Sequence, residues 1–179
     1  MAKWAINIHH SQAVFAVRHL MVTWVIGLFS KINGLLYFDP LNLAGASVAV
    51  EIDAASLHTG IEQRDEHLKS ADFLDVARYP IITFKSSLVE PVGLDHAWVY
   101  GDLVLCGVTG QVRLDVRWAG PAHLEDQGKI FTSYGFQAKT EIDREKFGIV
   151  YNIEMEHGGV GLSRQVYLTL NAEVDLIEE

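Results

Sequence analysis

Cysteine is nearly absent from this chain of 179 residues, in which Cys106 stands alone. A single cysteine excludes an internal disulfide and a zinc site built from several cysteines. Because Cys106 lies in a strand-like run without a basic neighbour, we predict a small core side chain rather than a reactive thiol.

Basic residues are also scarce. The chain has 14 lysines and arginines against 23 aspartates and glutamates, a formal net charge of -9. This balance argues against a nucleic-acid backbone or an anionic membrane surface as the main partner. We therefore expect no nucleic-acid partner.

Long apolar runs are missing as well. The longest nearly apolar run, residues 20–29, spans ten residues and includes Thr23 and Gly27, whereas a membrane-spanning helix needs about 20 apolar residues. Residues 1–12 lack the apolar stretch and cleavage site of a secretory signal. We expect no transmembrane segment and a cytoplasmic location.

The composition is that of a globular protein, with 49% hydrophobic and 21% charged residues, and we predict one domain over residues 1–179. Side chains alternate between apolar and polar through most of the chain, which predicts strands. These segments are residues 3–8, 11–20, 27–38, 47–53, 81–88, 98–105, 111–118, 129–142 and 166–176.

The remaining segments are predicted to connect these strands. Residues 22–26 are interpreted as a connection with one helical turn, residues 120–128 as a polar loop and residues 144–164 as an extended arm. Within residues 27–38 the apolar phase changes between Phe29 and Ile32, which predicts a bulge that bends one long strand.

One segment, residues 57–74, has the pattern of a short helix. Ile61, His67 and Leu68 fall near one helical face, and charged residues lie largely around the other. A short helix among many strands usually covers an edge or an open end of a sheet. We predict an antiparallel barrel with this helix over one end, rather than a sandwich. Small residues in phase with large apolar ones favour a hollow interior.

Several short motifs follow one another along the chain, and their order and spacing resemble those of the YceI-like family of polyisoprenoid-binding proteins. The motifs are Trp4-x-Ile6, His10-Ser11, Phe15-x-Val17-Arg18-His19, Gly27-x-Phe29, Thr59-Gly60, Arg64-Asp65, His67-Leu68, Phe73-Leu74-Asp75, Tyr79-Pro80, Ile82-Thr83-Phe84-Lys85-Ser86, Gly101-Asp102-Leu103, Gly107-Val108-Thr109, Arg144, Phe147-Gly148 and Val166. The chain departs from the family at Asn7, where many members have aspartate, and at Gly158-Gly159, in an arm that varies.

The resemblance implies a mainly β, lipocalin-like antiparallel barrel of about eight strands with one or two short helices covering an end. It implies binding, storage or transport of a long-chain amphiphile of the polyisoprenoid or fatty-acyl type. It implies no cofactor other than a lipid that co-purifies with the protein. The matching inward positions are Phe15, Val17, His19, Phe29, Ile32, Leu36, Phe84, Ser86, Leu103, Leu114 and Phe136.

Two polar residues have alternative interpretations. His19 is either a core histidine bonded to the backbone, which we favour, or a ligand contact. Arg64 either pairs with strand residues, together with Asp65, and fixes the helix, or it binds a ligand head group.

Two other functions stay open. One is a small-molecule enzyme or metal-dependent protein that uses His19, although we find no convincing catalytic group and expect no enzyme and no metal. The other is a stress-related interaction module. A homodimer is compatible with exposed strand edges.

Overall fold

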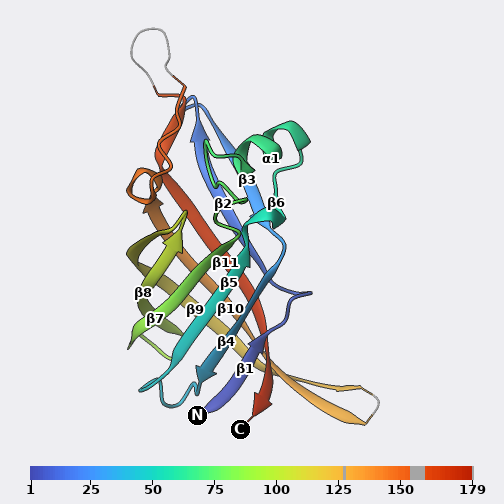
Figure 1. Ribbon diagram of the computed structural model, residues 1–179. Helices are drawn as coiled ribbons and strands as arrows, with labels where there is room; N and C mark the ends of the chain where they lie inside the picture. Colours follow the sequence, from blue (N-terminus) through green and yellow to red (C-terminus); the bar gives the residue numbers. More distant parts are fainter. Residues whose placement is uncertain (127, 154–159, 179) are drawn as a thin grey trace.

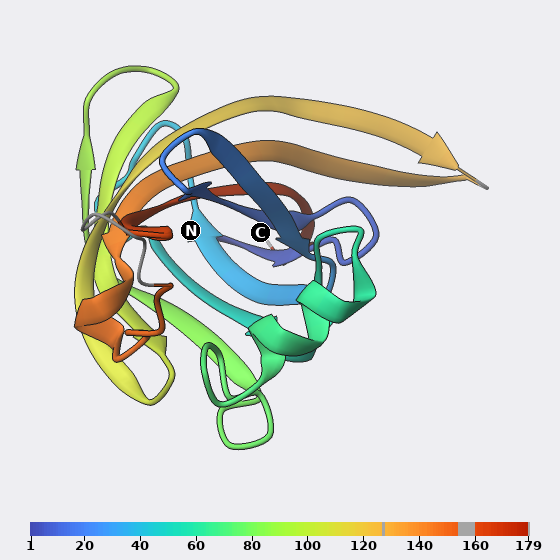
Figure 2. The same cartoon turned by 90° about the horizontal axis from the view of Figure 1, so that it is seen from above.

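The strands of the computed structural model form one antiparallel sheet that closes on itself, as Figures 1 and 2 show. The structure describes residues 1–126, 128–153 and 160–178. Gly158 and Gly159 lie outside the described residues. The strands are β1 (Ala2–Ile6), β2 (Gln12–His19), β3 (Thr23–Phe29), β4 (Ile32–Phe38), β5 (Ser47–Asp53), β6 (Leu57–His58), β7 (Ile81–Pro91), β8 (His96–Leu105), β9 (Val108–Asp126), β10 (Lys129–Asp143) and β11 (Leu162–Glu178).

Strand pairing explains how eleven strands make an eight-stranded barrel. β1 and β2 pair with successive parts of β11, while β3 pairs with β2 and β4 pairs with β1. β5 and β6 in turn pair with β4 and β3. Each of these three pairs of short strands occupies one position in the barrel, and the β1–β11 ladder closes it. The predicted barrel is confirmed.

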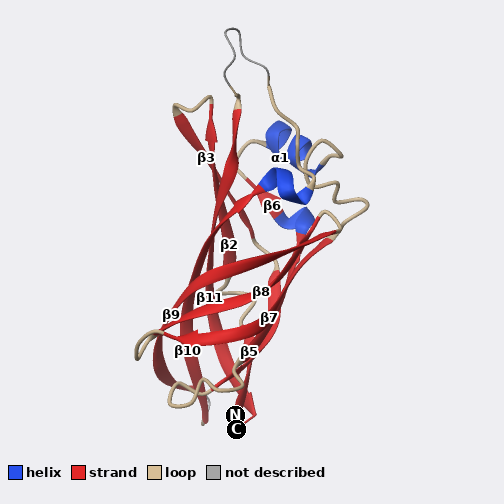
Figure 3. Ribbon diagram, turned by 90° about the vertical axis from the view of Figure 1, so that its left-hand side faces the viewer, coloured by secondary structure: helices blue, strands red, loops and turns tan. Residues whose placement is uncertain are grey.

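The helical elements gather at the end of the barrel away from the chain termini (Figures 1 and 3). The helix α1 covers Glu62–Lys69, and two 3-10 turns, η1 and η2, cover Ala54–Ser56 and Arg144–Phe147. No helix among the described residues is long and apolar enough to cross a membrane.

Two predictions near the N-terminus are wrong. Residues 22–26 are largely strand β3 rather than a connection, and the predicted long strand over residues 27–38 is broken between Phe29 and Ile32. The break between the two strands is held by hydrogen bonds of the Lys31 backbone. The backbone N–H of Lys31 bonds to Ser56 Oγ at 3.1 Å, and the carbonyl of Lys31 accepts from Asp53. The chain thus changes from pairing with β2 to pairing with β1 and β5.

Two later predictions also need correction. The predicted loop over residues 120–128 is strand as far as Asp126, because β9 and β10 continue as a hairpin that projects beyond the barrel (Figure 2). The last strand begins at Leu162, inside the predicted arm. Its first residues pair with the end of β2, where Leu162 faces His19.

Candidate functional site

The barrel encloses a cavity of about 470 Å³ that is lined almost entirely by apolar side chains. Every strand position of the barrel contributes to the lining, as the strict alternation of inward and outward side chains requires. Among the described residues that line it, there is no aspartate and no glutamate. An apolar molecule fits this interior, and an anion meets no carboxylate there.

The inward side chains show that the barrel is hollow. Val17, Leu36, Leu114 and Leu170 all line the cavity, yet each keeps part of its surface exposed. In a filled barrel, side chains at such positions meet across the axis and lose their exposed surface. The exposed apolar surface inside the barrel is therefore available to a ligand.

Aromatic side chains close the end of the cavity that lies near the termini. The Phe38 ring makes edge-on contacts with Trp118, Tyr134 and Phe136 at centroid distances of 5.1 to 5.4 Å. Trp4 packs edge-on against Tyr134 at 5.2 Å, and its indole N–H donates to the Phe38 carbonyl. This end forms a packed, largely aromatic floor.

The other end is covered by residues 61–76, which we call the lid and which include α1. Within it, Arg64, His67, Leu68, Phe73 and Leu74 line the cavity. The predicted helix over one end of the barrel is thus confirmed, although α1 is shorter than the helical pattern.

The lid is tied to the strand before it through Thr59. Arg64 donates from Nε to Thr59 Oγ1 at 2.8 Å and from Nη2 to the Thr59 carbonyl at 3.0 Å. Asp65 accepts the backbone N–H of Thr59 at 2.8 Å and contacts His58 Nδ1 at 3.1 Å. Asp65 thus contacts the strand residue His58, as the preferred interpretation expects, whereas both bonds of Arg64 go to Thr59, which follows the strand.

A cluster of three rings joins the lid to the segment after η2. His67 lies 5.1 Å from Phe73 and 4.9 Å from Tyr151 between ring centroids, and Phe73 lies 4.9 Å from Tyr151. All three side chains line the cavity. A ligand that passes between the lid and this segment must separate these rings.

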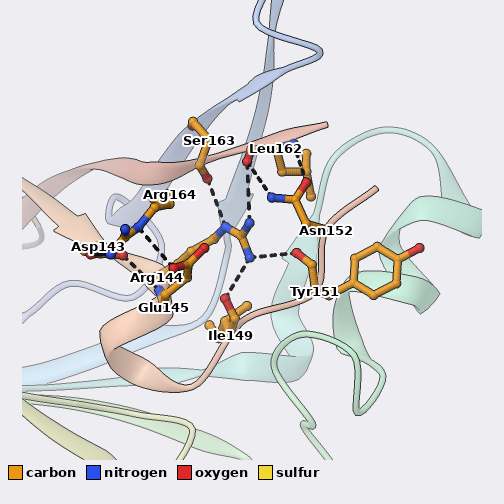
Figure 4. Close-up of polar contacts among 9 residues, drawn as sticks. All are labelled: Asp143, Arg144, Glu145, Ile149, Tyr151, Asn152, Leu162, Ser163 and Arg164. Atoms are coloured by element: carbon orange, nitrogen blue, oxygen red, sulfur yellow. Dashed lines mark hydrogen bonds and ion pairs between the residues drawn. The ribbon is translucent and has the colours of Figure 1, made fainter. Parts of the chain in front are cut away.

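Arg144 holds the segment after η2 in place (Figure 4). Its side chain is only 3% exposed, and its guanidinium donates to four backbone carbonyls. These belong to Ile149 at 2.7 Å, Tyr151 at 2.8 Å, Ser163 at 2.9 Å and Leu162 at 3.5 Å. Burial lowers the pKa of Arg144 from its usual value. The group stays cationic, because an arginine side chain is not deprotonated in proteins.

His19 lies at the same end of the cavity, on the last position of β2. It is half-buried, and its imidazole has no hydrogen-bond partner among the residues that the structure describes. The favoured interpretation, a core histidine bonded to the backbone, does not match this geometry. The ring is instead available to a polar group of a ligand.

Most of the residues predicted from the resemblance lie around the cavity. The lining includes Phe15, Val17, His19, Phe29, Leu36, Phe84, Leu103, Leu114 and Phe136, together with Arg64. Two do not line it. Ile32 is 2% exposed and packed on all sides. The Ser86 hydroxyl accepts the backbone N–H of Val48 at 2.9 Å, which uses it in the ladder to β5.

Arg144 and Tyr151 belong to this site, but neither of them was predicted as a site residue from the sequence. Both fall in residues 144–164, where alternation is weak. The single available signal was the presence of Arg144 among the family motifs, which gave it no role. Among the described residues, no group of three or more histidine, cysteine or acidic side chains is placed to hold a metal ion.

Comparison with known proteins agrees with this architecture. Residues 4–174 match the YceI-like domain. The chain belongs to the YceI-like family. Protein YceI of Escherichia coli O157:H7 is 38% identical over 140 residues, which cover 78% of this chain and 71% of that protein.

Two solved structures share the fold of this YceI-like protein. Burkholderia cenocepacia BcnA superposes with a TM-score of 0.79 at 22% identity, covering 94% of this chain and 98% of the other. A polyisoprenoid binding domain from Saccharophagus degradans, implicated in plant cell wall breakdown, gives a TM-score of 0.70 at 15% identity, covering 99% and 100%. At these identities, the two structures show a common fold.

Proposed function

We propose that this YceI-like protein binds a long-chain amphiphile, of the polyisoprenoid or fatty-acyl type, and stores or carries it. The observation that carries the proposal is the hollow apolar interior of about 470 Å³, closed by aromatic rings at one end. The proposal also extends to this chain the ligand that the name of the Saccharophagus degradans domain gives for that protein.

The hydrophobic effect supplies the binding energy. Each methylene buried contributes about 0.8 kcal/mol, so about ten buried methylenes contribute roughly 8 kcal/mol before the cost of lost ligand freedom. Because the lining is almost entirely apolar, the length of the ligand's tail rather than its chemistry would set the preference.

The polar end of the ligand would stay at the lid. Burying a polar head without partners is costly, and the floor consists of aromatic rings. At the lid, the lining supplies the imidazoles of His19 and His67 and the guanidinium of Arg64. A carboxylate or phosphate head suits these donors better than a cationic one, because no carboxylate lines the cavity among the described residues.

Binding without catalysis is part of the proposal. Among the residues that the structure describes, no carboxylate lies beside the cavity-facing His19 to orient the ring as a general base. A small-molecule enzyme built on His19 is therefore the weaker alternative. Turnover that requires His19 would favour it.

The test compares two neighbouring residues of β10. Ala138 lines the cavity, and Lys139 is exposed on the outside. Ala138→Trp fills the interior, whereas Lys139→Trp adds the same side chain outside. We expect native mass spectrometry after loading with a fatty acid or a polyprenol to show bound lipid on the wild type and on Lys139→Trp. Occupancy of Ala138→Trp should fall by about tenfold or more.

Both variants must unfold cooperatively for the comparison to count. A second inward substitution, Leu170→Trp on β11, guards against one that misfolds. A wild-type protein that takes up no amphiphile, or an Ala138→Trp variant that loads as well as the wild type, would overturn the proposed function.

A further inference from the structure

The hairpin of β2 and β3 ends in an exposed apolar turn that projects from the barrel at the same end as the lid (Figures 1 and 3). We call Leu20, Met21 and Val22 the apolar tip. Val22 is 79% exposed and Met21 46% exposed. Single exposed apolar residues are common, but three in succession at the end of a hairpin need an explanation.

The backbone of the apolar tip adopts a conformation that is unfavourable for its residue types. Leu20 and Met21 have φ angles of 50° and 57°, in the left-handed region. The backbone N–H of Val22 bonds to the His19 carbonyl at 3.1 Å and closes the turn. Such turns usually carry asparagine and glycine. Bulky residues there cost folding free energy, and strain of this kind collects at functional sites.

The outer face of the same hairpin continues the apolar surface. Ile26 is 60% exposed, and Trp24 is half-exposed. The Trp24 ring is held between Arg18, 5.0 Å from its centroid, and Tyr167 at 5.5 Å. Tryptophan and tyrosine with a nearby arginine are the side chains that favour the boundary between water and lipid.

The other face of the same hairpin belongs to the cavity wall. Val17, His19 and Val25 line the cavity, as do Arg64 and His67 of the lid. The apolar tip therefore lies at the end of the barrel where the polar lining residues gather. A ligand that leaves at this end emerges on the same side of the barrel as the tip.

The charge distribution permits contact of this hairpin with a bilayer. All 23 acidic residues of the chain follow residue 38, whereas Lys3, Arg18 and Lys31 precede it. The hairpin thus carries no carboxylate, although the protein has a net charge of -9. The lid at the same end carries Glu62, Glu66 and Asp72 at exposed positions. Contact with a bilayer is therefore confined to the hairpin, which takes no hydrated carboxylate into the interfacial region.

From these observations we propose that the apolar tip docks the protein on a lipid bilayer and brings the lid end of the cavity close to it. The proposal rests on the proposed lipid-binding function and names the surface from which the cavity is filled. The unpaired backbone of β3 limits how deeply the hairpin can insert into the bilayer. Within the described residues, β6 pairs with β3 only at Leu28 and Phe29. The outer edge before Leu28 must stay in contact with water.

A second copy of the chain fits this surface less well. Strand pairing along the open edge of β3 would cover Trp24 and Ile26 together with the backbone. It would leave Met21 and Val22 in water, so the strained apolar turn would remain without a role.

The test uses Val22→Glu and a matched control, Leu41→Glu. Leu41 is 95% exposed and lies in the connection after β4, at the end of the barrel near the termini. Wild-type protein should sediment with phosphatidylcholine vesicles equally at low and high salt, because insertion is apolar. We expect Val22→Glu to reduce the bound fraction by about tenfold or more and Leu41→Glu to leave it unchanged. Trp24 fluorescence should shift to the blue with vesicles, and Trp24→Phe should lose this signal.

Occupancy is measured in parallel, after loading with a fatty acid from detergent. Loading of Val22→Glu to the wild-type level, with lost vesicle binding, supports docking as a separate step. Wild-type protein that loads lipid but does not bind vesicles overturns the docking proposal. So does a dimer in sedimentation velocity that Val22→Glu dissociates. If the protein binds vesicles through Val22 but no lipid is found in the cavity after loading, docking is supported and the lipid-binding function is contradicted.

Discussion

Asp65 Oδ1 accepts the backbone N–H of Thr59 at 2.8 Å, across the junction between β6 and α1. The Thr59 hydroxyl donates to the same oxygen, and His58 Nδ1 lies 3.1 Å from the other one. The carboxylate is largely buried. One side chain thus joins the first turn of the lid to the strand that precedes it.

Removing this carboxylate should weaken the lid. We expect Asp65→Ala to lower the free energy of unfolding by about 1–3 kcal/mol, because the Thr59 donors lose their partner in a buried position. Thermal unfolding measures the change. Glu66→Ala, at an exposed position of the same helix, is the control and should stay within about 0.5 kcal/mol of the wild type. Equal losses for both would contradict the role of Asp65.

The contribution of the Asp65 carboxylate to the stability of the fold should depend on pH. Burial alone would raise the pKa of Asp65, but hydrogen bonds from Thr59 and the His58 contact outweigh it and lower the pKa. A lowered pKa stabilises the fold above the ordinary aspartate pKa of about 3.9, and this contribution is lost as the pH falls through the lowered value. The stability difference between wild type and Asp65→Ala should therefore shrink below about pH 4. Urea titrations at several pH values measure it, and a difference that grows in acid would contradict the assignment.

Arg144 and Arg164 provide a contrast between a buried and an exposed arginine. We expect Arg144→Met to lower the free energy of unfolding by about 3 kcal/mol or more, because buried carbonyls lose their donors. Arg164 is 57% exposed in its side chain, where it pairs with Asp143 at 2.7 Å and Glu145 at 3.1 Å. Arg164→Met should cost less than about 1 kcal/mol. Urea unfolding of the two variants tests the order, and a larger loss for Arg164→Met would refute it.

The sequence predicted the barrel best where one face of a strand is apolar and the other polar. In β5 and β8 the alternation places Val50, Val99 and Leu103 on an apolar face, and all three line the cavity. Alternation failed at β3. Trp24, Val25 and Ile26 are all apolar, although Trp24 and Ile26 face outward on the exposed hairpin. An apolar outer face cannot be told from a buried one by periodicity alone.

The site was harder to predict because its polar parts come from segments without periodicity. Residues 120–128 are polar and contain glycine and proline, so nothing distinguished the projecting β9–β10 hairpin from a loop. The contacts of Arg144 join residues up to 19 positions apart and use backbone carbonyls, which leave no residue pattern. Ser86 was in phase with Phe84, and its inward position was a reasonable expectation. Its hydroxyl is used by the Val48 backbone instead.

Cys106 was expected in a strand, but it lies in the turn between β8 and β9 with φ of 51°. It is half-buried beneath the lid, where its Sγ lies 3.5 Å from the carbonyls of Phe73 and Leu74. Burial, together with the nearby charge of Asp75, raises the pKa of the thiol to about 11. The expected lack of reactivity thus has a physical cause other than strand packing.

Iodoacetamide labelling of Cys106 would therefore report on the lid. At pH 8 a thiol with a pKa of about 11 is ionised in about one molecule in a thousand, against roughly a quarter for a free cysteine. We expect alkylation of the native protein to be about a hundredfold slower than of the protein in guanidinium chloride. Asp65→Ala should accelerate it and Glu66→Ala should not, because Phe73 and Leu74 cover Cys106 only while the lid is in place. Equal rates in native and unfolded protein would show that the lid leaves the thiol open to solvent.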